Sequence, residues 1–443
     1  MTDSPPADVL IATTVHWAST TRLALALADS GLRIAAVAPA QHALHRMSAI
    51  AASRVCSPHS GFAGAMTKAI TTLRPAMVIP GDDRAARGLY ALHDRMAGRG
   101  GRGLAIARVI RRSLGDPSSF PILARKSRFA DFCAAEGLPM PETVVVHGRR
   151  QFQALLACAS LPQVLKLDGR WGGRGVHVIR TIAEANDAFD HLMAWRGWRS
   201  AFRRALEELS AAPLLAKIHG DAPAISLQHF VEGGLANRAV LCREGTVLAG
   251  ITVASVQLGE ETGPSTVVRV IDHGGINDLT ARIVRRLNLS GFIGVDLVLD
   301  AAGGRPWIIE LNPRPTQVCH LAFSQESDMV SALACALRGA PARPLPRQIY
   351  GEGRVIALYP GEKWRDPGSV HLGTADHDIP WHQPEFIAAY RTPVADDPPS
   401  WVQSLARSCP IRWLRRPFAG IGGEKAVEAR PIVAAPPKTA GGG

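Results

Sequence analysis

The residues with the clearest capacity for chemistry are two acids and an amide in residues 294–314, GVDLVLDAAGGRPWIIELNPR. Apolar alternation around a glycine turn predicts a two-stranded hairpin, with Asp296 on one strand and Glu310 and Asn312 on the other. Side chains two positions apart share one face of a strand, and antiparallel pairing lets Asp296 reach the same face. Carboxylate and amide oxygens are ligands that Mg2+ takes, with phosphate oxygens completing its shell. The hairpin therefore predicts a metal site that faces phosphate, and the alternative is a hairpin with solvated acids.

A lysine in an apolar strand and a glycine-rich loop form a second set. Lys166 lies in the apolar run 164–168 (VLKLD), and the loop 169–175 (GRWGGRG) follows directly. A lysine inside such a strand is costly unless an anion pairs with it, and a loop with several glycines can fold its amide groups over phosphates. Each feature alone is common. Their order predicts a phosphate-binding pair, with Gly172, Gly173 and Gly175 as the flexible positions of the loop.

Two further positions gain meaning only from their order along the chain. Lys126 stands before a predicted helix and ahead of Lys166, where it is either a surface lysine or a second phosphate contact. The run 228–233 (QHFVEG) ends a predicted strand in apolar residues and a glycine. Free backbone N–H and C=O groups at such a strand end can hydrogen-bond an adenine edge, although the run by itself is an ordinary strand. The residues assigned to this contact are Gln228, His229, Phe230 and Val231.

Short apolar runs alternate with helical segments through residues 1–110, beginning with a strand at 9–13 and a helix at 20–30. This alternation predicts a parallel sheet covered by helices on both faces. The turn after the first strand, residues 13–17 (TTVHW), has no glycine. A dinucleotide-binding fold needs glycines there, because backbone amides must approach the pyrophosphate. We therefore expect Rossmann-like topology without NAD binding.

Composition narrows the class of protein. A chain of 443 residues is too long for one compact core, so two or three domains are expected. The net charge of +12 comes from scattered basic residues rather than from one run, which favours phosphate-rich small substrates over nucleic acid. Seven separated cysteines without a CxxC pair fit a reduced, cytoplasmic location. No uncharged run reaches the about 18 residues that a membrane span needs.

Taken in order, these motifs resemble those of the ATP-grasp superfamily of carboxylate–amine ligase-like enzymes. The resemblance covers roughly residues 8–340 and is most specific at Asp296 and the run 310–314, ELNPR. It implies an α/β (mixed α+β) fold: an ATP-grasp fold with an N-terminal Rossmann-like pre-ATP-grasp domain and a C-terminal extension. The boundaries expected from it are an N-terminal domain at 1–118, a two-part ATP-grasp domain at 119–340 with its hinge near 228–233, an extension at 341–425 and a disordered tail at 426–443.

The resemblance also implies an enzymatic activity, that of an ADP-forming ligase. Such an enzyme activates a small-molecule carboxylate as an acyl phosphate. It then transfers the acyl group to an amine or another nucleophile, such as a thiol. ATP and Mg2+, or Mn2+ in its place, are the implied cofactors. Lys126, Lys166 and the glycine loop would contact the ATP phosphates, and residues 228–231 would hold adenine. The implied metal ligands are Asp296, Glu310 and Asn312. Lys166 and Arg314 are the implied catalytic residues, and Arg314 would face the transferred phosphoryl group or the substrate carboxylate. Arg269 shares one face of a predicted strand with Val267, and it is either a further catalytic residue that stabilises an oxyanion together with Arg314 or a plain surface arginine.

The sequence departs from the family pattern after the hinge glycine, where many relatives carry an acid for ribose. Leu235, Ala236 and Asn237 stand there instead, so either Asn237 or Glu232 contacts the ribose, or the ribose contact is weaker than in those relatives. A second interpretation of the whole chain is a catalytically weak nucleotide-binding regulatory or scaffold protein. A homodimer is compatible with the sequence, but no motif supports it, and no motif identifies the carboxylate or the nucleophile.

Overall fold

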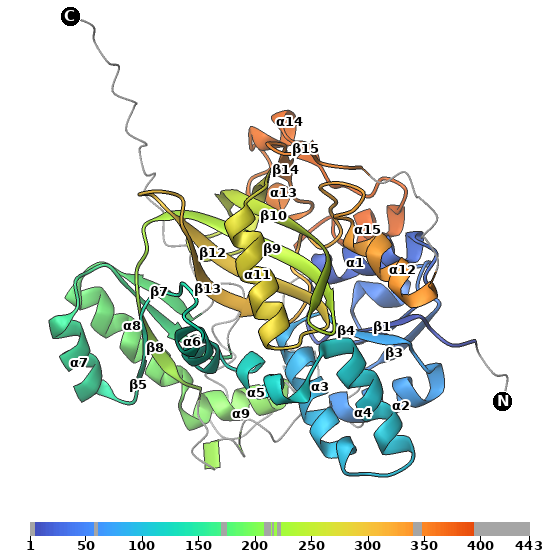
Figure 1. The fold of residues 1–443 in the computed structure, drawn as a ribbon, viewed down its shortest axis with the longest axis horizontal. Helices are drawn as coiled ribbons and strands as arrows, with labels where there is room; N and C mark the ends of the chain where they lie inside the picture. The colour runs from blue at the N-terminus through green and yellow to red at the C-terminus, as the bar shows by residue number, and fades with distance from the viewer. Residues whose placement is uncertain are drawn as a thin grey trace, which may run out of the picture.

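The computed structural model describes residues 5–56, 61–169, 175–207, 223–339 and 348–393, together with residues 214, 217 and 218. Its strands form three sheets, of four, seven and four strands. Figure 1 shows the seven-stranded sheet in the middle of the molecule, the second four-stranded sheet next to β13, and the N-terminal sheet on the other side. None of the helices in the described part of the chain combines the length and the hydrophobicity needed to cross a membrane.

The N-terminal sheet is parallel, as its alternating sequence predicts, and its strand order is β3-β2-β1-β4. Fully buried runs such as VLIA in β1 and IAAVA in β2 suit a sheet covered on both faces. Its strands are β1 (Val9–Ala12), β2 (Ile34–Ala38), β3 (Ala52–Val55) and β4 (Met77–Pro80), and its helices are α1 (Ala18–Asp29), α2 (Gly61–Leu73), α3 (Asp83–Ala97) and α4 (Arg102–Leu114), with the short 3-10 helix η1 (Ala43–Arg46).

A linker of η2 (Pro117–Ser119), α5 (Phe120–Leu123) and α6 (Lys126–Ala135) leads to the small sheet, whose order is β5-β8-β6-β7. Leu165 and Leu167 alternate into a core built with its helices, where Phe152 stacks on Phe189 at 4.4 Å between ring centroids. Lys166 lies between these two leucines and therefore points to the opposite face. The elements are β5 (Thr143–Val146), α7 (Arg149–Cys158), β6 (Gln163–Leu167), β7 (Val176–Ile179), α8 (Ile182–Trp195), α9 (Trp198–Glu207) and β8 (Ile225–His229).

The large sheet has the order β13-β12-β9-β10-β11-β14-β15. Helices α11 and α12 pack on its opposite faces, and each face has its own apolar core shared with the N-terminal domain. Alternating burial along β9, with Ala239 in one core and Val240 in the other, follows from a strand buried on both sides. The elements are β9 (Gly233–Arg243), β10 (Thr246–Leu258), β11 (Ser265–Ile271), α11 (Gly274–Arg286), β12 (Gly291–Asp300), β13 (Pro306–Asn312) and α12 (Met329–Arg338).

Residues 348–393 complete this sheet and reach back to the start of the chain. Strand β14 (Val355–Ala357) pairs with β11, and β15 (Asp376–His377) pairs with β14. The hydroxyl of Tyr390 lies 2.8 Å from that of Thr21 on α1, and Arg22 donates to the carbonyl of Asp378 at 3.1 Å. The extension is therefore an integral part of the packed structure. Its helices are α13 (Gly361–Arg365), α14 (His371–Thr374) and α15 (Pro384–Ala389).

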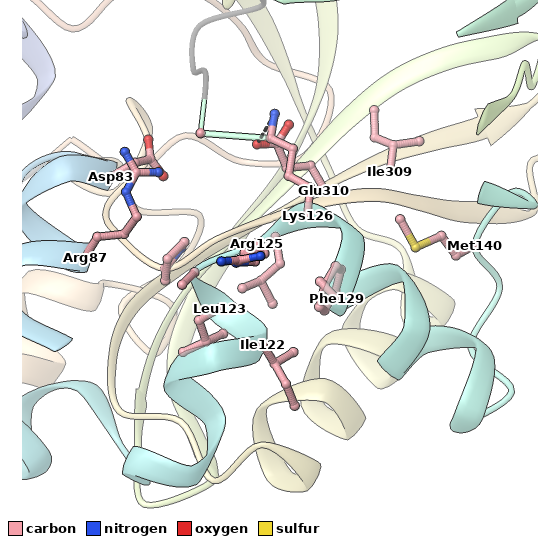
Figure 2. A pocket seen from close by; sticks show the side chains of 14 residues that line it. Asp83, Arg87, Ile122, Leu123, Arg125, Lys126, Phe129, Met140, Ile309 and Glu310 are labelled. Atoms are coloured by element: carbon pink, nitrogen blue, oxygen red, sulfur yellow. Dashed lines mark ion pairs between the residues drawn. The ribbon is translucent and has the colours of Figure 1, made fainter. Parts of the chain in front are cut away.

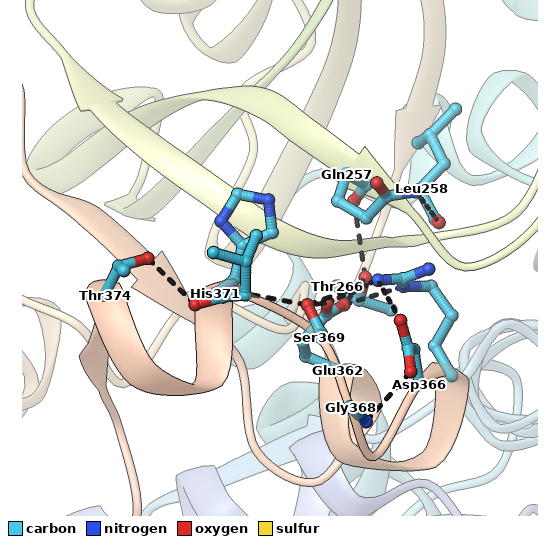
Figure 3. A network of polar contacts seen from close by, with 11 residues as sticks. Gln257, Leu258, Thr266, Glu362, Asp366, Gly368, Ser369, His371 and Thr374 are labelled. Atoms are coloured by element: carbon cyan, nitrogen blue, oxygen red, sulfur yellow. Dashed lines mark hydrogen bonds and ion pairs between the residues drawn. The ribbon is translucent and has the colours of Figure 1, made fainter.

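A buried carboxylate fastens this extension to β11 (Figure 3). Glu362 accepts hydrogen bonds from Thr266 Oγ1 at 2.6 Å and from Arg365 Nε at 2.8 Å, and the hydroxyl of Ser369 donates to its other oxygen. The guanidinium of Arg365, followed by the two hydroxyls, lowers the pKa of Glu362 to about 2. The charged form is therefore the one that stabilises the fold.

We expect Glu362→Gln to lower the free energy of unfolding by about 1–3 kcal/mol, because charge-assisted hydrogen bonds to a buried acid are lost. The stabilisation is fully present above the unfolded pKa of about 4.3 and is lost as the pH falls toward the folded value of about 2. Urea unfolding at pH 7 and at pH 3 checks this. Exposed Glu352→Gln is the control, and equal stability of the two variants at pH 7 would contradict the assignment.

Candidate active site

The hairpin predicted over residues 294–314 is present as β12 and β13. Asp296 lies directly opposite Glu310, and on its other side it lies opposite Asn237 of β9. Directly opposed residues of antiparallel strands point to the same side of a sheet. Because Gly294 lies opposite Asn312, that side chain joins the same face. The register thus collects two carboxylates and two amides on one face of the large sheet.

A β-bulge brings in the lysine of the small sheet. The register of β12 and β13 shifts between the pairs Asp296–Glu310 and Leu297–Ile308, which leaves Ile309 as the extra residue. Its carbonyl accepts a hydrogen bond from Lys166 Nζ at 3.1 Å. Lys166 is 7% exposed and therefore lies enclosed between the two sheets. Asp296 and Glu310 (the acid row) and the strand that carries Lys166 were predicted from separate motifs. In the structure they face each other.

Lys126 is the first residue of α6, and its Nζ lies 3.0 Å from Glu310 Oε1. Burial disfavours both lysine charges, but the outcomes differ. The ion pair with Glu310 outweighs burial and holds the pKa of Lys126 above its usual value. Burial lowers the pKa of Lys166 to about 8, and repulsion by the charge of Lys126 acts in the same direction. The attraction of Glu310 offsets only part of this shift. The site therefore holds two cations of unequal basicity beside one carboxylate.

Asp296 accepts hydrogen bonds on both oxygens, from Asn237 Nδ2 at 2.6 Å and from Asn312 Nδ2 at 2.7 Å. Burial and the neighbouring charge of Glu310 raise its pKa. Within the part of the chain that the structure describes, no three His, Cys, Asp or Glu side chains form a metal site of their own. Two carboxylates and an amide fit Mg2+ or Mn2+ that takes further ligands from phosphate and water, and a cation there would relieve the repulsion between the acids.

Arg314 extends this row toward the N-terminal domain. Its Nε donates to Asp83 Oδ2 at 2.7 Å, its Nη2 donates to Asn312 Oδ1 at 3.1 Å, and its guanidinium carbon lies 4.6 Å from the ring centroid of Trp17. Burial disfavours the charge of Asp83, but Arg314 overcomes it and holds the pKa of Asp83 below its usual value. Sequence reasoning did not single out Asp83. The only signal for it was its place after a buried strand, where parallel sheets put ligand-binding residues.

Three of these groups, Asp83, Lys126 and Glu310, line a pocket between α3, the linker and β13 (Figure 2). Asp83 and Arg87 reach it from α3, whereas Met140 and Ile309 lie on the far side, with the ion pair of Lys126 and Glu310 between them. The remaining lining residues are Ile122, Leu123, Ala124, Arg125, Phe129, Gly169, Leu311 and Pro313.

The predicted adenine strand is β8, which ends at His229. Gln228 is buried, and its side chain donates to Thr143 Oγ1 at 2.8 Å rather than remaining free. The backbone N–H of His229 donates to the carbonyl of Glu142 at 2.9 Å. Phe230 and Val231 follow the strand and are half-buried. Contact of these residues with adenine stays a prediction.

Of the glycine loop, Gly172 and Gly173 lie outside the described residues, so their predicted phosphate contact stays a prediction. Gly175 has a φ of +80°, and its carbonyl accepts from the N–H of Leu167 at 2.9 Å. The β6–β7 hairpin is therefore closed at the base of the loop.

The structure does not bring Arg269 into the site. Val270 and Val253 are paired, and Val253 is paired with Asn237, so Val270 shares the face of the acid row. The adjacent Arg269 must point to the other face, where it is exposed. The predicted oxyanion contact is therefore not supported by this placement. Asn237 lies beside Asp296 as a hydrogen-bond donor, a role that the sequence did not indicate, and its ribose contact stays a prediction.

Gly294, which lies opposite Asn312, has no room for a side chain. A Cβ at Gly294 would lie 2.2 Å from Thr316 Cγ2, and the Thr316 hydroxyl donates to Asn237 Oδ1 at 3.1 Å. We expect Gly294→Ala to cost about 1–3 kcal/mol of unfolding free energy, because Thr316 must move. Adding Thr316→Ser removes the clashing methyl group, keeps the hydroxyl and should restore most of the loss. Urea unfolding of both variants tests this, and no rescue would contradict the clash.

Comparison with known proteins gives a family match for part of the chain and several solved structures of similar fold. Residues 217–318 match the family model of the ATP-grasp domain, and no curated protein matches the chain in sequence. L-amino acid ligase from Bacillus licheniformis is similar in structure, with a TM-score of 0.53, 15% identity and 80% of each chain covered. The biotin carboxylase domain of Hydrogenobacter thermophilus 2-oxoglutarate carboxylase, solved with MgADP, ADP and bicarbonate, has a TM-score of 0.54 and 13% identity over 80% of this chain and 74% of that one.

Carboxyaminoimidazole ribonucleotide synthase from Aspergillus clavatus, solved with ATP, has a TM-score of 0.54 and 14% identity over 79% of this chain and 80% of that one. Identities this low establish the fold, and the fold is that of ATP-grasp proteins, as the motif order predicts. The ATP-grasp family model thus matches residues 217–318, and the fold of the described chain is similar to those of the ligase and the synthase.

Proposed function

We propose that this protein is an ATP-dependent, ADP-forming ligase that activates a carboxylate as an acyl phosphate and transfers the acyl group to an amine or another nucleophile. One observation carries the proposal. The acid row of Asp296 and Glu310 and the lysines Lys126 and Lys166 converge between two sheets, with Lys166 bonded to the chain next to Glu310. A catalytically weak scaffold protein would not need two acids and two lysines at one place, with one of the lysines buried.

The lysines would contact the ATP phosphates, and the acids would hold the metal ion. Lys126 and Lys166 lie where they can neutralise phosphate oxygens, and their enclosure strengthens each charge interaction. Asp296, Glu310 and Asn312 would hold Mg2+ or Mn2+, which supplies charge neutralisation at the phosphates when it is bound. Arg314 is pre-oriented by Asp83 and Trp17, and it would face the transferred phosphoryl group or the acid. We also propose the domain boundaries given above.

The proposed reaction has two steps. A carboxylate oxygen forms a bond to the γ-phosphorus while the bond from that phosphorus to the β,γ-bridging oxygen breaks, and ADP leaves. The amine nitrogen then bonds to the acyl carbon, the bond from that carbon to the phosphate oxygen breaks, and the amine loses a proton. Inorganic phosphate leaves with the electron pair. Water would also attack the acyl phosphate, so the reaction requires an enclosed site.

The comparisons support the chemical class without naming the substrates. The similar structures include a ligase of L-amino acids, and another holds MgADP and bicarbonate. In the test, the chain is incubated with Mg-ATP, pooled carboxylates and pooled amines, and condensed products are identified by mass. We expect a new amide or related product together with ADP. Nucleotide binding without ADP release in any pool would favour the regulatory or scaffold function instead.

A further inference from the structure

Helix α3 places an arginine, Arg87, in the pocket, and no sequence motif singled this residue out. Arg87 lies one helical turn after Asp83 on α3, so both side chains share one face of the helix. Asp83 is paired with Arg314, which ties this face of α3 to the acid row. Arg87 lines the pocket beside Lys126 and Glu310. The contact that orients Arg314 therefore also holds the helix that carries Arg87 against the pocket.

The guanidinium of Arg87 lies at the end of the strand that carries Lys166. A Cβ at Gly169 would be 3.7 Å from Arg87 Nη1, and Gly169 is two residues beyond the end of β6. Within the described residues, Arg87 has no hydrogen bond or ion pair of its own. The charge of Arg87 acts on nearby Asp83 and helps to lower the pKa of that acid, but no hydrogen bond among the described residues occupies its guanidinium. A half-buried arginine in this situation is available for a ligand.

The charges of the pocket favour an anion. Three cationic side chains line it (Arg87, Arg125 and Lys126) against two acids, Asp83 and Glu310. Both acids already have cationic partners, Arg314 and Lys126 respectively. The pocket wall therefore carries a surplus of positive charge next to the groups assigned to phosphoryl transfer. A guanidinium binds carboxylate and phosphate oxygens through two parallel hydrogen bonds.

We propose that Arg87 binds an oxyanion of the reaction, either the carboxylate of the acyl substrate or the terminal phosphate of the nucleotide. The N-terminal domain then supplies an anion-binding residue in addition to orienting Arg314. This inference rests on the proposed function and adds to it a residue that selects acidic ligands. It also explains why α3 lies against the ATP-grasp elements with Asp83 and Arg87 on the same face.

The test uses the full chain, Arg87→Met, and the control Arg95→Met, which removes an exposed arginine of the same helix outside the pocket lining. Dissociation constants of MgADP and Mg-AMPPNP are measured by calorimetry. Phenylglyoxal modification of Arg87 is followed by peptide mass, with Mg-AMPPNP or with MgADP plus the pooled carboxylates as protecting ligands. Loss of a charge-assisted contact should weaken the affected ligand by about 10- to 100-fold in Arg87→Met only.

The outcomes separate the two sources of the anion. Protection by Mg-AMPPNP but not by MgADP, with weaker Mg-AMPPNP binding in Arg87→Met, identifies the terminal phosphate. Protection only when the carboxylates are added identifies the substrate acid. If wild-type protein binds Mg-AMPPNP, but no ligand protects Arg87 and the variant binds normally, the Arg87 proposal is overturned and the proposed function stands. If wild-type protein binds no nucleotide, both are overturned.

Discussion

Glu310→Gln should reduce ATP turnover about 10²- to 10³-fold, the effect of removing one group that stabilises charge in a transition state. Glu310 belongs to the acid row and is also the ion-pair partner of Lys126. The substitution removes its charge and keeps the shape of the side chain. ADP release in the presence of the productive carboxylate and amine is the measurement. The circular dichroism spectrum should remain that of the wild type, since Glu310 is not part of an apolar core.

The matched control for this result is Glu136→Gln. Glu136 also forms an ion pair, at 2.6 Å, but its partner Arg286 is exposed and the pair lies away from the pocket lining. Surface pairs contribute little, so turnover of this variant should equal that of wild type. Full turnover by Glu310→Gln would show that the acid row does not serve phosphoryl transfer, and it would remove the main support for the ligase proposal.

Lys166→Met should weaken MgADP binding and lower ATP turnover by about 10²-fold, because an enclosed cation is lost where the phosphates are expected. The same residue predicts a pH dependence. Burial lowers the pKa of Lys166 to about 8, so the side chain is charged below that pH and neutral above it. Affinity of wild-type protein for MgADP should therefore fall as the pH rises through about 8.

Three variants test this assignment. Lys166→Met should show weak binding at every pH, whereas Lys166→Arg should keep its charge and bind at pH 9 as it does at pH 7. Lys68→Met, which removes an exposed lysine on α2, should behave as wild type. A pH profile that is identical in wild type and Lys166→Met would rule out titration of this lysine as the cause.

Much of the fold could be predicted because the chain's local patterns agree with its tertiary structure. Alternation around a glycine turn predicted the hairpin that became β12 and β13, and an apolar strand before a glycine loop predicted β6. These strands are buried through much of their length, so their hydrophobic period is set by the faces they cover. The relation of Asp296 to Glu310 and Asn312 needs only strand parity and a hairpin, and both are local.

What could not be predicted depends on contacts between distant elements. The sequence shows that Arg269 and Val267 share a face of β11, but only the order of the strands shows that this is the face away from Asp296. The bulge at Ile309, which gives Lys166 its partner, leaves no sign in the apolar pattern. Asp83 and Arg87 look like ordinary charges at the start of a helix, because Arg314, which pairs with Asp83, and Gly169, which lies near Arg87, are far away in the sequence.

The contact between α1 and the C-terminal extension affects how the nascent chain must fold. Leu25 of α1 is buried with Phe386 and Tyr390, and the hydroxyl of Thr21 meets that of Tyr390, which is 369 residues further along the chain. At ordinary rates of translation, roughly 20 to 70 s separate the synthesis of these partners. During that interval, the N-terminal sheet can already cover Leu23 and Leu27 of α1, but the side with Thr21 and Leu25 lacks the cover of Phe386 and Tyr390. This side of the first helix thus stays partly exposed until the extension has been made.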